Sequence, residues 1–151
     1  MSKLIKKIEI DATAERVWEV LSDYGDVYKW APIVAASRVL TASSTGLGAE
    51  RACTIPGFGD VVETVTEWQN GRSLGYRVTG VPGVTDQQNR FSVALEGDGS
   101  VVVLEVDLDM VAPEEHRAAA ELQFAEVMET TLAGLKQYVE TGESMRLPAA
   151  A

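Results

Sequence analysis

The sequence has one cysteine and one histidine among its 151 residues. A lone Cys53 cannot form a disulfide within the chain, and Cys53 with His116 cannot supply the cysteine and histidine ligands of a zinc site. No phosphate-binding loop, dinucleotide fingerprint or paired metal motif is present either. We therefore expect no metal and no cofactor, and we expect Cys53 to be a small buried apolar residue.

Basic residues are also scarce, because 13 lysines and arginines stand against 23 aspartates and glutamates, for a formal net charge of -10. Such a chain would repel a phosphate backbone, so nucleic-acid binding is not expected. No apolar stretch approaches the roughly 18 residues of a membrane span. The first ten residues lack a signal peptide's apolar core. These absences predict a cytoplasmic protein without a membrane span.

What remains is a globular composition, with 46% hydrophobic residues. A chain of this length folds as one domain and buries about two-thirds of its unfolded surface. We expect a single domain over residues 1–142 and a frayed C-terminal tail over residues 143–151. The sequence leaves the oligomeric state open between monomer and dimer.

The N-terminal third predicts a strand and two short helices. Residues 4–10 are rich in β-branched side chains and include two lysines. Thr13 is a suitable cap for a helix through Leu21, whose apolar residues recur three or four apart. A second short helical segment is expected from Tyr24 to Trp30, ending before Pro32.

Alternating apolar and polar residues dominate residues 33–110 and predict about six strands. The segments that separate them are 43–46 (SSTG), 56–59 (PGFG), 70–71 (NG), 82–83 (PG) and 97–99 (GDG). Turns this short join antiparallel neighbours. A long helix then follows, with proline and glutamates in its first turn and Gly142 at its end. Its expected buried stripe is Leu122, Ala125, Met128, Leu132, Leu135 and Val139, widened by Phe124, Val127, Thr131 and Tyr138.

This order predicts an α+β fold in which a curved antiparallel sheet of about seven strands wraps around a long C-terminal helix. The sequence resembles the START/SRPBCC superfamily, whose fold is the helix-grip or Bet v-like fold, and most closely its polyketide cyclase/dehydrase-like branch. The segments that carry the resemblance are 10–18 (IDATAERVW), 28–32 (YKWAP), 46–48 (GLG), 63–68 (ETVTEW) and 74–78 (LGYRV). The resemblance covers the whole chain and implies an elongated apolar cavity between the sheet and the long helix.

Alternation predicts which side chains line that cavity. On the strand over residues 61–68 the uncharged set is expected to face inward, which places Glu63 and Glu67 outside. The inward set would then be Val62, Thr64, Thr66, Trp68, Leu74, Tyr76, Val78, Gln87, Asn89, Phe91, Val93, Leu95, Val102, Leu104, Val106, Leu108 and Met110. The informative polar members of this set are Thr64, Tyr76, Gln87 and Asn89. They either bond to backbone or water, or meet a ligand in a pocket.

Two loops are expected to form the mouth of the cavity. The turn at residues 54–59 and the turn at residues 79–85 each place an apolar residue among Pro and Gly, and alternate turns of a meander lie at the same end of the sheet. In the plant abscisic-acid receptors that the fold resembles, paired loops close over the bound hormone. We expect Phe58 to cover the mouth, beside Val81 or Val84 and with Trp30 on the helical side. The alternative is a hydrophobic plug that never opens.

One catalytic motif is present by coincidence. Gly71, Ser73 and Gly75 match the GxSxG pattern of hydrolases, and Asp86 and His116 follow in hydrolase order. That serine requires a turn from a strand into a helix, whereas Ser73 leaves a hairpin and enters a strand. Asp107 and Asp109 share a strand face, which is expected to be solvated rather than to hold a cation.

Three functions follow as hypotheses. The first is binding of a small, largely hydrophobic molecule, lipid-like or polyketide-like. The ligand-contact residues are predicted to be Trp30, Phe58, Thr64, Tyr76, Val81, Gln87, Asn89, Phe91, Phe124, Met128, Thr131 and Leu135. The second, implied by the resemblance, is a polyketide cyclase/dehydrase, with Tyr76, Asn89 and Thr64 as candidate catalytic residues. Glu63 joins them if the strand register is shifted by one residue. The third is a protein-interaction module that uses the outer face of the sheet.

Overall fold

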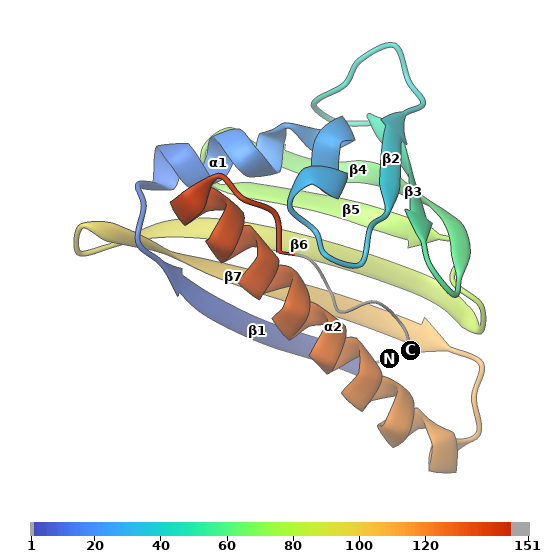
Figure 1. The fold of residues 1–151 in the computed structure, drawn as a ribbon. Coiled ribbons are helices and arrows are strands. Elements are labelled where there is room, and N and C mark those ends of the chain that lie inside the picture. The colour runs from blue at the N-terminus through green and yellow to red at the C-terminus, as the bar shows by residue number, and fades with distance from the viewer. Residues whose placement is uncertain (1, 146–151) are drawn as a thin grey trace.

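The computed structural model describes residues 2–145, which form a seven-stranded antiparallel sheet and a long C-terminal helix (Figure 1). The elements in chain order are β1 (Ser2–Ile10), α1 (Ala14–Ser22), the short 3-10 helix η1 (Tyr24–Lys29), β2 (Ala36–Val39), β3 (Glu50–Ile55), β4 (Gly59–Gln69), β5 (Ser73–Thr79), β6 (Val84–Glu96), β7 (Gly99–Met110) and α2 (Glu114–Thr141). The predicted order of elements and the predicted fold class are confirmed.

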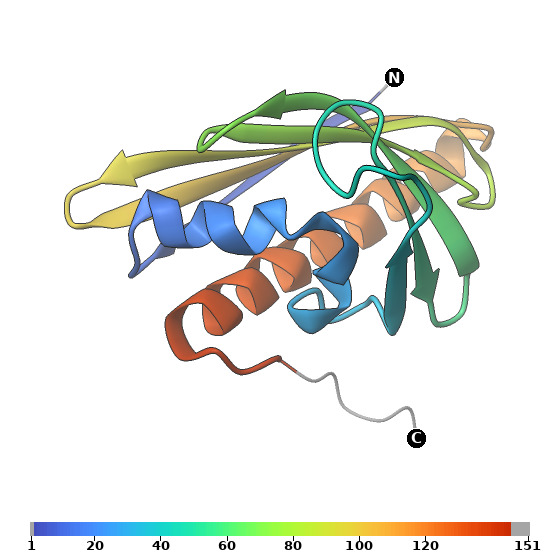
Figure 2. The same cartoon turned by 90° about the horizontal axis from the view of Figure 1, so that it is seen from above.

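Strands β2 to β7 form a meander in which each strand pairs with the next, and β1 pairs with β7 at the far edge. The sheet curves, and α1, η1 and α2 all lie on its concave side (Figure 2). The helix α2 ends at Thr141 and is capped by Gly142 in a left-handed conformation, so the helix end predicted at this glycine is confirmed. Ser144, in the predicted tail, donates a hydrogen bond to the carbonyl of Lys29. The rest of the predicted tail, from residue 146, lies outside the described residues.

Local sequence signals account for the helix ends. The side chain of Thr13 accepts a hydrogen bond from the backbone N–H of Arg16, 3.1 Å away, which caps α1 as predicted.

Glycine is also required in the interior of α2, because a Cβ at Gly134 would lie 2.6 Å from the carbonyl oxygen of Trp30 and 2.5 Å from the ring of Pro32. The helix therefore approaches the segment after η1 closely. None of the helices among residues 2–145 has the length and hydropathy needed to cross a membrane.

The prediction for the inward face of β4 is wrong over most of the strand. Val61, Glu63 and Val65 are the buried residues, while Thr64 points outward and bonds to Glu50. Glu63 was predicted to face outward because it is charged. In the structure a buried arginine of β3 neutralises that charge, so Glu63 can face the core. A register shift between Val65 and Glu67 then reverses the alternation. Before the shift Val62 and Thr64 face outward, as does Thr66 within it, whereas after the shift Trp68 packs against the core as predicted.

The other strands follow the prediction except at one end. The expected inward residues of β5 and β7 are buried, as are Gln87, Phe91 and Val93 on β6. Leu95 is 76% exposed, because it lies beside the turn of the β6–β7 hairpin, which projects past the helices (Figure 2). Leu122 of α2 is 67% exposed, and the fully buried residues of this helix begin only at Met128. The core is therefore built by the sheet, by α1 and η1, and by the C-terminal half of α2.

Candidate ligand-binding site

A buried ion pair lies on the concave face of the sheet. Arg51 and Glu63 are cross-strand partners on β3 and β4, and the Arg51 Nε lies 2.7 Å from the Glu63 Oε1. The two residues are 3% and 9% exposed. Sequence reasoning missed Arg51 and held Glu63 only in reserve for a shifted register, which is the register that the structure has. The sequence does contain a signal for the burial of Arg51, because Arg51 and Cys53 alternate with outward-facing residues on the neighbouring strand β3.

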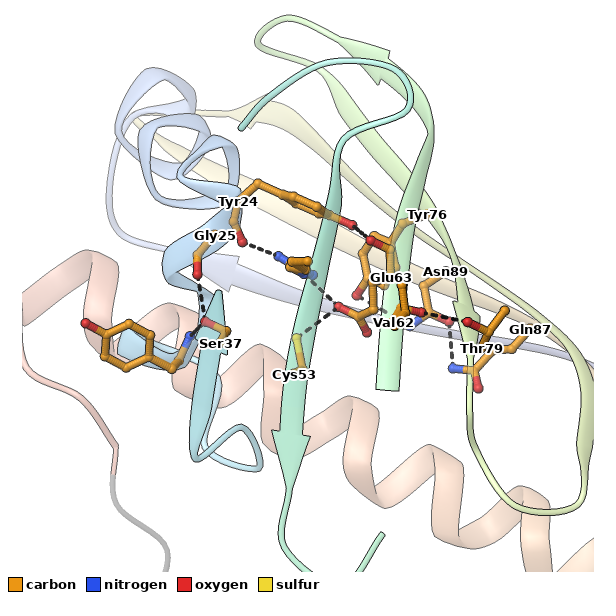
Figure 3. Close-up of polar contacts among 12 residues, drawn as sticks. Tyr24, Gly25, Ser37, Cys53, Val62, Glu63, Tyr76, Thr79, Gln87 and Asn89 are labelled. Atoms are coloured by element: carbon orange, nitrogen blue, oxygen red, sulfur yellow. Dashed lines mark hydrogen bonds and ion pairs between the residues drawn. The ribbon is translucent and has the colours of Figure 1, made fainter. Parts of the chain in front are cut away.

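Aromatic rings enclose the guanidinium of Arg51. Its carbon lies 3.8 Å from the ring centroid of Tyr24 and 4.9 Å from that of Tyr76. Its Nη1 donates to the backbone carbonyl of Tyr24, and the Tyr24 hydroxyl in turn donates to the backbone carbonyl of Glu63 (Figure 3). This arrangement satisfies the buried charge with an opposite charge, a carbonyl and two π-faces. It fixes η1 to the sheet and holds the Tyr76 ring in place.

The surroundings set the charge state of each group. Burial opposes the charge of Arg51, but Glu63 together with Tyr76, Tyr24 and Cys53 outweighs it, so the pKa of Arg51 lies above its ordinary value. Burial raises the pKa of the Tyr24 and Tyr76 hydroxyls, with Glu63 adding to the shift and Arg51 opposing it. Burial, reinforced by Glu63, also raises the pKa of the Cys53 thiol to about 12. The phenols and the thiol are therefore neutral near pH 7 and can donate hydrogen bonds there.

A row of three polar side chains extends from this cluster across the concave face. The Asn89 Nδ2 donates to the Tyr76 Oη over 3.4 Å, and the Gln87 Nε2 donates to the Asn89 Oδ1 over 3.0 Å (Figure 3). Tyr76 and Asn89 are register partners on β5 and β6, and Gln87 follows two residues away on the same face as Asn89. Among residues 2–145, the Gln87 Oε1 is buried and has no hydrogen-bond partner.

Apolar residues surround this row. Phe91 stacks against Tyr76 with ring centroids 6.4 Å apart and meets Trp30 edge-on at 5.9 Å. Three predicted contact residues of α2 also pack in the same core, namely Met128 and Leu135, which are buried, and Phe124, which is half-buried. The structure therefore brings together the residues predicted at the sheet, the helix and Trp30.

Two of the predicted polar contacts lie elsewhere. Thr64 is on the outer face, where its hydroxyl donates to Glu50 over 2.7 Å. Thr131 donates to the carbonyl of Val127 one turn earlier in α2, so its own helix satisfies its hydroxyl. Neither residue belongs to the polar row.

The two predicted mouth loops are neighbours. A Cβ on Gly80, after β5, would lie 3.1 Å from the carbonyl oxygen of Asp60, after the turn that holds Phe58. The Val111 N–H after β7 donates to the Gly83 carbonyl, so the connection into α2 lies at this end as well. Val81 is half-buried against the core, whereas Phe58 is 58% exposed. Phe58 is thus not a buried plug in this conformation.

Residues set aside in the sequence also have defined surroundings. Ser73 is buried and its hydroxyl donates to Glu67, far from any helix start, which agrees with the view that the GxSxG match is a coincidence. Asp107 lies 3.8 Å from the amino group of Lys3 on β1. Within residues 2–145, no three His, Cys, Asp or Glu side chains are grouped closely enough to hold a metal ion.

The outer face of the sheet carries ion pairs. Arg90 lies 2.8 Å from Glu67 and 3.5 Å from Glu105, which joins three strands. A separate hollow of about 260 Å³ opens beside the β6–β7 hairpin, with Glu9, Asp11, Glu96 and Lys136 among its lining residues. Its lining is largely charged and exposed, so it does not suit an apolar ligand. The concave face is the surface that combines apolar walls with a short row of polar groups.

Comparison with known proteins identifies the family of this chain. Residues 1–140 match the family described as polyketide cyclase/dehydrase and lipid transport. No curated protein matches the sequence. The chain is similar to the Zhui aromatase/cyclase from a Streptomyces species, with a TM-score of 0.79, 18% identity, and coverage of 92% of this chain and 93% of that chain.

Two further solved structures show the same fold. A START superfamily protein from Mycobacterium smegmatis has a TM-score of 0.75 and 20% identity, covering 91% of this chain and 97% of that chain. The protein XoxI from Bacillus cereus has a TM-score of 0.79 and 18% identity, covering 96% of this chain and 100% of that chain. With the sequence match and the shared fold together, the chain belongs to the polyketide cyclase/dehydrase and lipid transport family and has the helix-grip fold of the START superfamily.

Proposed function

We propose that this protein binds a small, largely apolar molecule between the concave face of the sheet and α2. The observation that carries the proposal is the convergence of Tyr76, Asn89 and Gln87 into one hydrogen-bonded row that extends from the buried ion pair among apolar core residues. Small-molecule sites have this composition, with apolar walls for affinity and a few polar groups for orientation. The apolar part of the ligand would lie against Phe91 and Met128.

Access would be from the end that carries the two neighbouring loops. Phe58 is exposed there on a turn whose glycines take positive φ angles, and Val81 lies on the adjacent loop. A large apolar side chain on such a turn gains burial only when it folds over a ligand or the mouth. Phe58 and Val81 would therefore act as the cover. Trp30, which was predicted at the helical side of the mouth, would instead support Phe91 through the contact between their rings.

The first test is to purify the protein gently, denature it and identify the released small molecules by mass spectrometry. The proposal expects a stoichiometric apolar compound from the wild type. Asn89→Leu interrupts the polar row and should lower the recovered amount several-fold. Gln88→Leu is the matched control, because Gln88 lies one residue away on the outer face and bonds to Thr66. Empty wild-type protein that also gains no thermal stability from lipids, sterols or aromatic polyketides would refute the proposal.

The same convergence favours a second candidate, a polyketide cyclase/dehydrase. Tyr76 carries a neutral hydroxyl on the concave face, and a neutral phenol can donate a hydrogen bond to a carbonyl oxygen during an aldol closure. Incubation with a linear poly-β-ketone and chromatography of the products tests this activity. Tyr76→Phe should lower cyclised product at least about tenfold. Tyr28→Phe, at an exposed tyrosine of η1, should leave it unchanged.

A further inference from the structure

The polar row on the concave face has a direction. The Gln87 amide donates to Asn89, and the Asn89 amide donates to the hydroxyl of Tyr76. Both amide nitrogens thus donate toward the Tyr76 end of the row. The oxygen of Gln87 is left at the opposite end. That Oε1 atom is buried without a partner among residues 2–145, on a side chain that is 6% exposed.

An amide oxygen can only accept hydrogen bonds. A buried acceptor that has no donor destabilises the folded protein, and nearly all such groups in folded proteins are paired. The Gln87 Oε1 at the unpaired end of the row is therefore an acceptor that requires a hydrogen-bond donor. Figure 3 shows the Gln87 amide at the end of the row, away from Glu63.

We propose that the ligand carries a neutral hydroxyl group that donates to the Gln87 Oε1, so that Gln87 selects hydroxylated apolar molecules over their ethers. This inference rests on the proposed function, because it assumes that a ligand occupies the concave face. It adds the chemical class of the ligand and the residue that discriminates it.

The donor is a hydroxyl rather than an ammonium group because of the charges nearby. The acidic group of the cluster, Glu63, is already paired with Arg51 at 2.7 Å. Two neighbours of Gln87 on the same face, Asn89 and, on β7, Leu108, are neutral, and the charge that α2 brings to this end of the sheet is the cation of Arg117, at the carbonyl of Met110. A cationic donor would lose its hydration there without gaining an opposite charge. A phenol or an alcohol loses much less, and its oxygen-bound proton fits an amide acceptor.

Matched probes test the inference. One pair is β-naphthol and β-naphthyl methyl ether, and the other is dodecanol and its methyl ether, so that each ether keeps the apolar body, loses the donor and gains one methyl group. Dissociation constants are measured by calorimetric titration of the wild type, which requires no variant. The alcohol of at least one pair should bind about tenfold more tightly than its ether, as expected for one buried hydrogen bond.

Two variants then locate the discrimination. Gln87→Met keeps the volume and removes the acceptor, so its alcohol-to-ether ratio should fall to about one. Gln88→Met, one residue away on the outer face, should keep the wild-type ratio. Circular dichroism confirms that each variant is folded before titration.

The outcomes separate this inference from the proposed function. If in neither pair the alcohol binds the wild type more tightly than its ether, the inference is wrong while the proposed function stands. A ratio that survives in folded Gln87→Met also overturns it, because another group then reads the hydroxyl. If no probe binds and the purified protein contains no small molecule, the proposed function fails and this inference fails with it.

Discussion

The buried pair of Arg51 and Glu63 gives the sharpest stability prediction. Glu63→Leu leaves the guanidinium of Arg51 buried at 3% exposure without its carboxylate. Breaking such a pair from one side costs about 3–5 kcal/mol, because the remaining charge has lost its partner and cannot recover its hydration. Arg51→Met leaves Glu63 in the corresponding position and should cost a similar amount. Either loss is a large fraction of the roughly 5–15 kcal/mol that stabilises a typical protein.

The double variant Arg51→Met, Glu63→Leu should be far less harmful than either single change. Replacing both ions by apolar side chains is often neutral or stabilising. One cost remains, since the Tyr24 carbonyl loses the donor that it meets at 2.8 Å, which is worth about 1 kcal/mol. The double variant should thus lie within about 2 kcal/mol of the wild type. It should differ from the sum of the single effects by at least about 3 kcal/mol.

Urea unfolding of the four proteins, followed by fluorescence, measures these differences. Arg90→Met is the matched control, because Arg90 also pairs with a glutamate at 2.8 Å but on the outer face, with side-chain exposures of 38% and 34%. That change should cost no more than about 1 kcal/mol. Single variants of Arg51 and Glu63 that each cost less than the control, or a double variant that equals their sum, would refute the reasoning.

Three other changes test separate parts of the structure. Gly134→Ala should lower the free energy of unfolding by about 1–3 kcal/mol despite its higher helix propensity, because the new Cβ would meet the Trp30 carbonyl and Pro32; equal or higher stability in a thermal melt would contradict this packing. The pKa of Cys53 is raised from 9.0 to about 12 by burial and then by Glu63, so its contribution to stability is complete below pH 9 and is lost as pH rises toward 12. The free energy of unfolding of Cys53→Ala should therefore fall less steeply with pH over that range than that of the wild type, by up to about 1.4 kcal/mol per pH unit. If urea titrations at several pH values give the same pH dependence for both proteins, this reasoning is wrong. Phe58→Ser should change the unfolding free energy by less than about 0.5 kcal/mol while raising the dissociation rate of a bound apolar probe, and a large loss of stability would instead identify Phe58 as structural.

The sequence predicted the elements well because their signals are local. Thr13 and Gly142 mark helix ends through their own side-chain and backbone chemistry, and short glycine turns require antiparallel neighbours. Alternation also identified the polar groups on β5 and β6, since Tyr76, Gln87 and Asn89 share the inward face with obvious core residues. Their ligand contacts stay a prediction.

The errors arose where distant residues decide the outcome. Thr64 was placed inward because Glu63 was assumed to avoid the core, yet Arg51 on the next strand makes that burial possible. The register shift after Val65 then reverses the alternation, which no count of apolar positions detects. Leu122 fits the helical stripe as well as Met128 does, but only Met128 lies where the sheet covers it.

By itself, the sequence determined the order of the elements, their approximate ends and the sets of residues that share a face, because periodicity and turn chemistry act over a few residues. Only the tertiary structure decided which face of β4 is buried and which charge neutralises Glu63, because both depend on strand register. The direction of the polar row is likewise tertiary. It places the unpaired oxygen of Gln87 at one end, since the hydrogen bond from Asn89 to Tyr76 forms only after β5 and β6 are aligned.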